Sequence, residues 1–276
     1  MSRSLALVAT LVAGEGADPL SLPWRLLRHE HVAAVRGMLA DRYAPATANR
    51  HLAALRGVLK AAWRLGQMSA EDLARATDVP SVRGSTVPAG REITHGEIGA
   101  LIRACGDCPR GRRDAVLLAT GYGAGLRRAE IAGLDLADID LEAASVLVRH
   151  GKGNRQRMTY LASGGEELIA RWIAVRGDAP GALLHPVRRG GRMDRRRISP
   201  HGVYRALDAL RERAGVTPFS THDLRRSWIS HLLAAGADIS TCQRLAGHSQ
   251  VSTTQRYDRR PEEEKKKASR LLHLPI

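Results

Sequence analysis

The chain has 276 residues, 43% of them hydrophobic and 26% charged, so it is long enough for two modest domains with a core each. Its formal charge of +15 and pI near 10.8 are typical of proteins that bind DNA or RNA through counterion release, although a GC-rich genome would also enrich arginine. The three cysteines exclude a disulfide framework and fit a reducing cytoplasm, and no apolar run approaches the roughly 20 residues of a membrane span.

The first 78 residues are predicted to be mostly helical, because apolar residues recur there at helical spacing. Residues 5–12 form an apolar stretch that indicates a buried helix rather than a signal peptide, since no small-residue cleavage site follows it. Further helices are expected over 31–42 and 48–65, and a shorter one over 69–76 begins at Ser69. The apolar stripe of the third helix comprises Leu52, Leu55, Val58, Leu59, Ala62 and Trp63.

The segment 79–91 is the predicted linker, because it is rich in Pro and Gly and lacks apolar periodicity. Beyond it, Thr94 and Glu97 form a capping box that starts a helix. Cys105 and Cys108 have the spacing of metal ligands, but no second Cys or His pair follows, so a loop between helices is the favoured interpretation. The other predicted elements are helices over 109–122, from about 126, over 163–176, 199–214, 221–235 and 239–246, and a β-hairpin of 146–148 and 156–161.

The second half of the chain carries six polar side chains in distinctive local sequences. One is a hydroxyl nucleophile and five can contact a phosphate, a set that suggests phosphoryl transfer without a metal. They are Arg127 in Gly-Ala-Gly-Leu-Arg-Arg-Ala-Glu-Ile (123–131), Lys152 in Gly-Lys-Gly-Asn-Arg (151–155), His222 and Arg225 in Thr-His-Asp-Leu-Arg-Arg-Ser (221–227), His248 in Leu-Ala-Gly-His (245–248) and Tyr257 in Ser-Thr-Thr-Gln-Arg-Tyr (252–257).

The order and flanking residues of this set resemble the tyrosine recombinase (phage integrase) family over roughly residues 20–276. The resemblance implies a mainly α fold with a small antiparallel β-sheet. A helical core-binding (SAM-like) domain over 1–84 would precede a tyrosine recombinase catalytic domain over 85–276, with residues 259–276 as an interaction tail. It also implies double-stranded DNA as the partner, a homo-tetramer on DNA, a 3′-phosphotyrosyl intermediate, a Holliday junction, and no cofactor or metal.

By this resemblance, Arg127 and Arg225 are the paired phosphate clamps, a role that suits the planar, permanently charged guanidinium. Glu130 is expected to orient Arg127 through an ion pair. Arg128 and Arg226 stand beside the clamps and serve as internal controls, because a solvated surface charge is the alternative interpretation of any single arginine.

Thr221 is expected to cap a helix and to place His222 at its positive end, where the imidazole stays neutral and suits accepting a proton. The resemblance assigns that proton to Tyr257, the nucleophile. His248 would hydrogen-bond a non-bridging oxygen, and Lys152 would protonate the departing 5′ oxygen.

Three alternatives remain: relaxation of supercoils by the same chemistry, as by a type IB topoisomerase; a catalytically idle DNA-binding protein; and a protein with impaired recombination, in which residues 1–84 form a poor DNA clamp. The two-domain organisation and the tail favour recombination, and the complete set of six side chains favours an active enzyme. The sequence therefore predicts a site-specific recombinase or integrase that serves a mobile element and acts in the cytoplasm.

Overall fold

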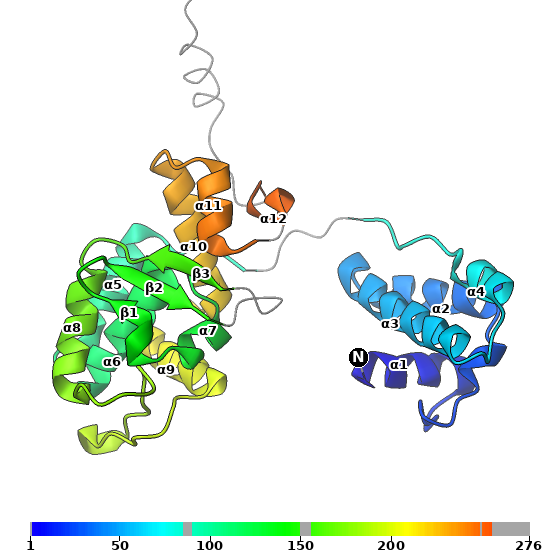
Figure 1. Ribbon diagram of the computed structural model, residues 1–276, viewed down its shortest axis with the longest axis horizontal. Helices are drawn as coiled ribbons and strands as arrows, with labels where there is room; N and C mark the ends of the chain where they lie inside the picture. Colours follow the sequence, from blue (N-terminus) through cyan, green and yellow to red (C-terminus); the bar gives the residue numbers. More distant parts are fainter. Residues whose placement is uncertain (1, 85–89, 150–155, 249, 256–276) are drawn as a thin grey trace, which may run out of the picture. The chain divides into compact units, whose positions relative to one another are not determined.

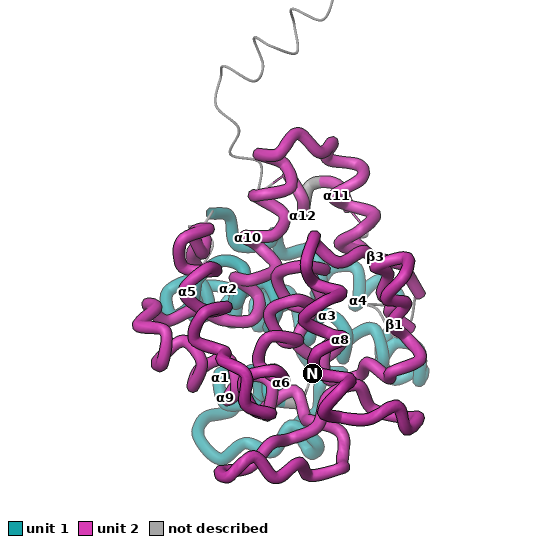
Figure 2. Tube along the Cα trace, turned by 90° about the vertical axis from the view of Figure 1, so that its left-hand side faces the viewer, with its two compact units in different colours: residues 1–89 teal, residues 90–276 magenta. Residues whose placement is uncertain are grey.

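The computed structural model describes residues 2–84, 90–149, 156–248 and 250–255 (Figure 1). The chain forms two compact units, residues 1–89 and 90–276, which Figure 2 colours teal and magenta. The division falls inside the segment expected to be a linker. Among the described residues, no helix is both long and apolar enough to cross a membrane.

Unit 1 is helical, and its longest helix, α3, packs against the other elements of the unit. Leu52, Leu55 and Leu59 of α3 are fully buried, as the apolar stripe predicts. Trp63 was expected in that stripe but is 38% exposed, because Ala62 takes the core position in the last turn and Trp63 lies about 100° further round the helix. The elements are α1 (Ser2–Ala13), η1 (Trp24–Leu26), α2 (His29–Arg42), α3 (Pro45–Arg64) and α4 (Ala70–Thr77).

Two of the helix starts predicted from polar caps, at Ser69 and Thr94, are confirmed. The hydroxyl of Ser69 accepts a hydrogen bond of 3.0 Å from the Asp72 amide and begins α4. Thr94 and Glu97 form the reciprocal capping box of α5. Each cap satisfies amide groups that the first turn of a helix would otherwise leave without acceptors.

Unit 2 is mainly helical around α6, which packs against α5, α8 and α9 (Figure 1). The helix predicted over 109–122 is α6 followed by a π-turn, η2, which packs against α10. The helical elements are α5 (His95–Cys105), α6 (Pro109–Leu118), η2 (Ala119–Gly123), α7 (Arg128–Gly133), η3 (Leu136–Asp138), α8 (Gly165–Arg176), η4 (Arg189–Gly191), α9 (Pro200–Arg213), α10 (Thr221–Ala234), α11 (Ile239–Ala246) and α12 (Val251–Gln255).

A three-stranded antiparallel sheet of order β1-β2-β3 completes unit 2 and confirms the predicted fold class. β2 (Ser145–Val148) and β3 (Arg157–Tyr160) are the arms of the predicted hairpin, paired with Val148 opposite Arg157. β1 (Ile139–Asp140) was not predicted, because two residues are too short to show a strand pattern. β3 also packs against α11.

The cysteine pair has structural roles in the fold. Cys105 is buried in the core of unit 2, and Cys108 caps α6 by accepting a hydrogen bond from the Gly111 amide at 3.4 Å. Among the described residues, no group of His, Cys, Asp and Glu has the arrangement of a metal site.

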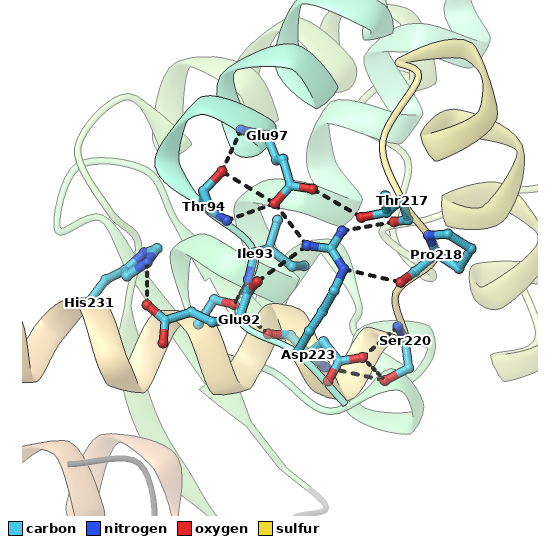
Figure 3. A network of polar contacts seen from close by, with 11 residues as sticks. Glu92, Ile93, Thr94, Glu97, Thr217, Pro218, Ser220, Asp223 and His231 are labelled. Atoms are coloured by element: carbon cyan, nitrogen blue, oxygen red, sulfur yellow. Dashed lines mark hydrogen bonds and ion pairs between the residues drawn. The ribbon is translucent and has the colours of Figure 1, made fainter. Parts of the chain in front are cut away.

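The first described residues of unit 2 run along α10 (Figure 3). The Ile93 amide donates a 2.7 Å hydrogen bond to the Ser227 hydroxyl, and Glu92 lies 3.3 Å from His231. Gly90 has a φ of +100°, and a Cβ there would lie 2.1 Å from a carboxylate oxygen of Asp223. Residues 90–93 are therefore fitted against α10.

Arg91 ties the same segment to the residues just before α10. Its guanidinium donates to the carbonyl oxygens of Thr217 (2.8 Å) and Pro218 (3.2 Å) and to the Glu97 carboxylate (2.8 Å) (Figure 3). The hydrogen bond from Arg91 is the main cause that lowers the pKa of Glu97 to about 2. We call residues 90–93 the entry strap.

Candidate active site

The first two turns of α10 carry His222 and Arg225. Ser220 caps the helix: its hydroxyl accepts from the Asp223 amide at 3.3 Å, and the Asp223 carboxylate accepts from the Ser220 amide at 2.8 Å. The prediction of Thr221 as the cap was wrong by one residue, because Asp223 completes the capping box with the residue three positions before it. His222 still lies in the first turn, near the positive end of the helix dipole.

Arg225 is almost entirely buried, at 1% exposure. One terminal nitrogen donates to the carbonyl oxygen of Gly125 and the other to that of Ala246. The guanidinium thus joins the turn before Arg127 to the end of α11. Gly125 has a φ of +65°, and a Cβ there would lie 2.2 Å from the ring of Trp228, so only glycine fits where this turn crosses α10.

Arg127 is the N-cap residue of α7 and forms the expected ion pair with Glu130. Its terminal nitrogen Nη1 lies 2.8 Å from one carboxylate oxygen, and its backbone amide donates to the other at 2.8 Å. The second terminal nitrogen lies 3.5 Å from the Gly247 carbonyl oxygen. The Arg127 side chain is 27% exposed, so part of the guanidinium remains open.

Arg157, the first residue of β3, belongs to the site although sequence reasoning missed it. It grips Glu130 with both terminal nitrogens, at 2.9 and 2.8 Å, and its Nε donates to the Leu245 carbonyl at 3.0 Å. Burial acts to raise the pKa of Glu130, but the hydrogen bonds from Arg157 and Arg127 outweigh it and lower the pKa to about 2. The sequence does carry one signal for Arg157. It lies two residues before Thr159 and therefore on the same, inward-packing face of β3, where a buried arginine needs a carboxylate partner.

Three guanidinium groups lie at the C-terminal end of α11. Arg157 reaches the carbonyl of Leu245, Arg225 that of Ala246, and Arg127 approaches that of Gly247. Carbonyls at a helix C-terminus carry partial negative charge, so cations are stabilised there. Backbone carbonyl oxygens at the end of α11 therefore hold the three arginine side chains in place.

Gly247 ends α11 in the left-handed conformation, with a φ of +61°. A Cβ at this position would lie 2.8 Å from Cδ of Arg157. Glycine thus permits both the turn into His248 and the close passage of Arg157.

His248 follows this turn and hydrogen-bonds through Nδ1 to the Thr254 hydroxyl at 3.0 Å. Burial, followed by the charges of Arg225 and Arg127, lowers the pKa of His248 to about 4. Partial burial, followed by the charge of Arg225, also lowers the pKa of His222, although this residue is exposed to solvent. Both imidazoles are thus predominantly neutral near pH 7. Thr254 is fully buried and was not recognised from the sequence, where it is one hydroxyl among several.

The structure brings together Arg127, His222, Arg225 and His248 of the predicted set. Arg225 and Arg127 reach the carbonyl oxygens of Ala246 and Gly247, next to His248, and His222 lies one helical turn before Arg225 on α10. Lys152 and Tyr257 lie outside the described residues. Of the two control arginines, Arg128 is exposed, but Arg226 is 6% exposed and lies 3.9 Å from Asp223. Arg226 is not a surface residue, because α10 is covered on most sides.

This arrangement offers fixed positive charge to an anion and two neutral imidazoles beside it. Guanidinium groups held by carbonyls and by Glu130 need little reorganisation when an anion arrives, a condition that favours electrostatic stabilisation of a transition state. A neutral imidazole can accept a proton with one nitrogen and donate a hydrogen bond with the other.

Comparisons with known proteins identify relatives of this site and fold. The Phage integrase family matches residues 91–264. A Tyrosine recombinase XerC of Myxococcus xanthus is 32% identical over 246 residues, which cover 83% of this chain and 76% of that protein. A Tyrosine recombinase XerD of Mycobacterium tuberculosis is 36% identical over 229 residues, covering 76% and 68%.

Solved structures share the fold at low sequence identity. The Tn1549 transposon integrase in complex with transposon right end DNA superposes with a TM-score of 0.69 at 15% identity, covering 98% of this chain and 91% of that one. The XerH site-specific recombinase in a post-cleavage complex gives a TM-score of 0.62 at 18% identity, covering 89% and 70%.

Proposed function

Because this chain belongs to the phage integrase family and is a tyrosine-type DNA strand transferase, we propose that it recombines DNA through a covalent 3′-phosphotyrosyl intermediate. The observation that carries the proposal is the convergence of four predicted residues in unit 2: Arg225 and Arg127 reach the carbonyl oxygens beside His248, and His222 lies one turn before Arg225. Unit 1 is assigned as the core-binding domain that holds the duplex, and unit 2 as the catalytic domain.

Arg127 and Arg225 are proposed to offset the negative charge on the phosphodiester. A phosphodiester repels nucleophiles because its non-bridging oxygens are anionic, and charge on them grows in the transition state. Arg127 offers a partly open guanidinium, while Arg225 supplies positive charge from a buried position. Glu130 and Arg157 keep Arg127 in place and are positioning residues.

Tyr257 is proposed as the nucleophile, with His222 as its proton acceptor and His248 as a hydrogen-bond donor to the phosphate. The Tyr257 oxygen forms a bond to phosphorus as the bond to the 5′ oxygen breaks, and His222 accepts the phenolic proton. If the Thr254 hydroxyl donates to Nδ1 of His248, then Nε2 carries the proton and donates to a non-bridging oxygen.

Lys152 is proposed to give its proton to the departing 5′ oxygen. Nearby cations lower the pKa of a lysine and make that transfer easier. The freed 5′ hydroxyl of a partner strand then attacks the phosphotyrosyl bond and releases Tyr257. Because the ester bond is exchanged rather than hydrolysed, the step needs no external energy source.

The assembly proposed for strand exchange is a homo-tetramer on two duplexes, with a Holliday junction between the two rounds of exchange. We propose that the reaction takes place in the cytoplasm and integrates or resolves a mobile element. The relatives named XerC and XerD support recombination at specific sites.

Covalent capture tests the nucleophile. The DNA site that the purified protein protects is determined first, and a duplex nicked beside that site is then used so that a cleaved strand is lost. Wild type should form a protein–DNA adduct, and Tyr257→Phe should bind the duplex but form none. Tyr160→Phe is the matched control, since Tyr160 is 55% exposed on β3. An adduct in Tyr257→Phe at the wild-type level would contradict the assignment.

Strand joining to a second duplex separates recombination from relaxation of supercoils, and absence of any wild-type adduct would indicate a DNA-binding protein without activity.

Lys152 is tested by changing the leaving group. Lys152→Ala should cleave ordinary DNA slowly and recover on DNA whose bridging 5′ oxygen is replaced by sulfur, because a thiolate leaves without a proton. Equal defects on both substrates would exclude the general-acid role and leave Lys152 as a positioning charge.

A further inference from the structure

Five arginines line a pocket in unit 2 that contains none of the six proposed catalytic residues. The pocket has a volume of about 360 Å³ and lies among α6, α9 and the loop that carries η4. No carboxylate lines it. We call it the arginine pocket, and its arginines are Arg110, Arg113, Arg189, Arg196 and Arg205.

The loop over the pocket is an ordered hairpin rather than a loose segment. Val187 and Met193 form an antiparallel bridge, the Asp194 amide donates to the Pro186 carbonyl at 2.9 Å, and Gly191 packs against Pro109 at the start of α6. Between residues 188 and 197 the sequence has six arginines and one aspartate. The fold thus fixes a dense positive charge beside α6 and α9, in the yellow-green part of Figure 1.

Arg113 indicates what the pocket accommodates. The residue is 5% exposed, and its Nε donates to Asp114 at 2.8 Å. Asp114 also binds Arg213 at 2.7 Å, so one carboxylate serves two guanidinium groups. Neither terminal nitrogen of Arg113 donates to an acceptor among the residues that the structure describes. Those nitrogens are not among the fully buried atoms that lack a partner, so they remain accessible and can donate to an anion in the pocket.

The rim has the same excess of positive charge. Within the described part of the chain, Arg110, Arg189 and Arg205 have no carboxylate partner, whereas Arg196 lies 2.8 Å from Asp194. Guanidinium groups around one small pocket repel each other. A bound phosphate reduces that repulsion and accepts hydrogen bonds from several arginines at once.

We propose that the arginine pocket binds a backbone phosphate of the DNA substrate, away from the phosphate that is cleaved. The inference rests on DNA as the substrate but not on the catalytic roles proposed above. A duplex places a phosphate every 3.4 Å or so of rise along each strand, so a protein that holds the scissile phosphate meets others nearby. The pocket would therefore contribute to affinity without taking part in the chemical step.

The test compares the salt dependence of DNA binding in four proteins. Arg110→Ala and Arg205→Ala each remove one rim arginine, and Arg103→Ala removes an exposed arginine of α5 outside the pocket. Arg113 is left intact because it holds Asp114. The dissociation constant for a short duplex of arbitrary sequence is measured by fluorescence anisotropy over a range of salt concentrations.

Each rim substitution should lower the slope of log affinity against log salt by about 0.9. Between about 50 and 200 mM salt, wild type should then lose about 3.5-fold more affinity than either rim variant. Arg103→Ala should keep the wild-type slope. The proposal would be overturned if all four proteins had the same slope. It would also be overturned if Arg103→Ala lowered the slope as much as the rim variants do, because the slope would then report overall charge rather than a contact in the pocket.

Two further measurements separate the possible explanations. With saturating protein, Arg110→Ala and Arg205→Ala should form the covalent adduct at the wild-type rate, and a large loss there would place the pocket in the chemical step. If wild type itself forms no adduct, the proposed function fails while the slope comparison still decides the pocket.

Inorganic phosphate distinguishes a free anion from DNA. Its effect on the thermal unfolding midpoint is compared with that of chloride at equal ionic strength. Phosphate that stabilises wild type but not the rim variants, combined with unchanged DNA slopes, would show that the pocket holds a free anion and would overturn the assignment to DNA.

Discussion

Arg127 is the site arginine with the most open side chain, and its neighbour Arg128 provides a matched comparison. Arg127→Ala removes a donor from the charge that develops on the phosphate, so single-turnover cleavage should slow by about a hundredfold or more. Arg128→Ala removes the same charge from an exposed position one residue on, and cleavage of bound DNA should change little. Similar rate losses in both variants would mean that Arg127 acts only through the overall charge.

The lowered pKa of His248 predicts how stability depends on pH. In the folded protein the pKa of His248 is about 4, whereas the ordinary pKa of a histidine is 6.5. As pH falls between these values, the unfolded chain binds a proton that the folded protein does not, so the free energy of unfolding decreases. The contribution is fully present above pH 6.5 and declines as pH falls toward 4.

His248→Gln removes this titration. Urea unfolding between about pH 7 and pH 5 should show wild type losing more stability than the variant. His201→Gln, at an exposed position on α9, is the control and should follow wild type. Parallel curves for wild type and His248→Gln would contradict the buried, neutral imidazole.

At this scale the sequence identified residues that stand in distinctive local contexts. Arg127, His222, Arg225 and His248 were predicted together, and the structure brings them together. Arg157 was missed because its partner Glu130 lies 27 positions away: strand alternation can indicate an inward-facing arginine, but it does not identify the carboxylate that binds it.

Among the elements of the site, the end of α11 depends most on a single residue type. Gly247→Ala introduces a Cβ at positive φ and against Cδ of Arg157. Gly236 also has a positive φ, of +97°, but a Cβ there has nothing within 4 Å. Gly236→Ala should therefore show only the backbone strain of about 1 kcal/mol.

Gly247→Ala should lose that amount and also displace Arg157 from Glu130, so covalent capture should fall by about tenfold or more. Chemical unfolding and capture are measured on both variants. Equal stability losses with unchanged capture would show that the passage of Arg157 beside Gly247 does not matter.

Helices were predictable where polar caps and apolar periodicity coincide, as at Ser69 and Thr94. The interruption of the predicted helix 109–122 by η2 was not, because a π-turn has no local sequence signal and is fixed here by packing against α8 and α10. The cap of α10 was misplaced for a different reason: Ser220 and Thr221 are both good caps, and only Asp223 decides between them.

For the whole molecule, the tail 259–276 is predicted to hold protomers together. Leu271, Leu272 and Leu274 are apolar residues in a strongly basic chain, and each buried leucine contributes about 1.5–3 kcal/mol. Replacing the three by alanine should weaken assembly on DNA by about tenfold or more while capture on a single nicked site persists.

Sedimentation of the protein–DNA complexes and the yield of exchanged strands measure the effect. Replacing Lys265, Lys266 and Lys267 by alanine is the control for a change in the same tail that leaves the leucines intact. Loss of single-site capture in the leucine variant would indicate that the tail supports the fold of the protomer instead.

The entry strap determines where a force on the chain before Gly90 would reach unit 2. Tension on the chain at Gly90 is delivered first to Ile93 and Arg91, whose hydrogen bonds end on Ser227 and on the carbonyls of Thr217 and Pro218. Those anchors flank the turn that carries His222 and Arg225. A pull strong enough to lengthen these bonds would therefore act on α10 before it reached any other helix of the site, so α10 is the part of the catalytic unit that bears the load.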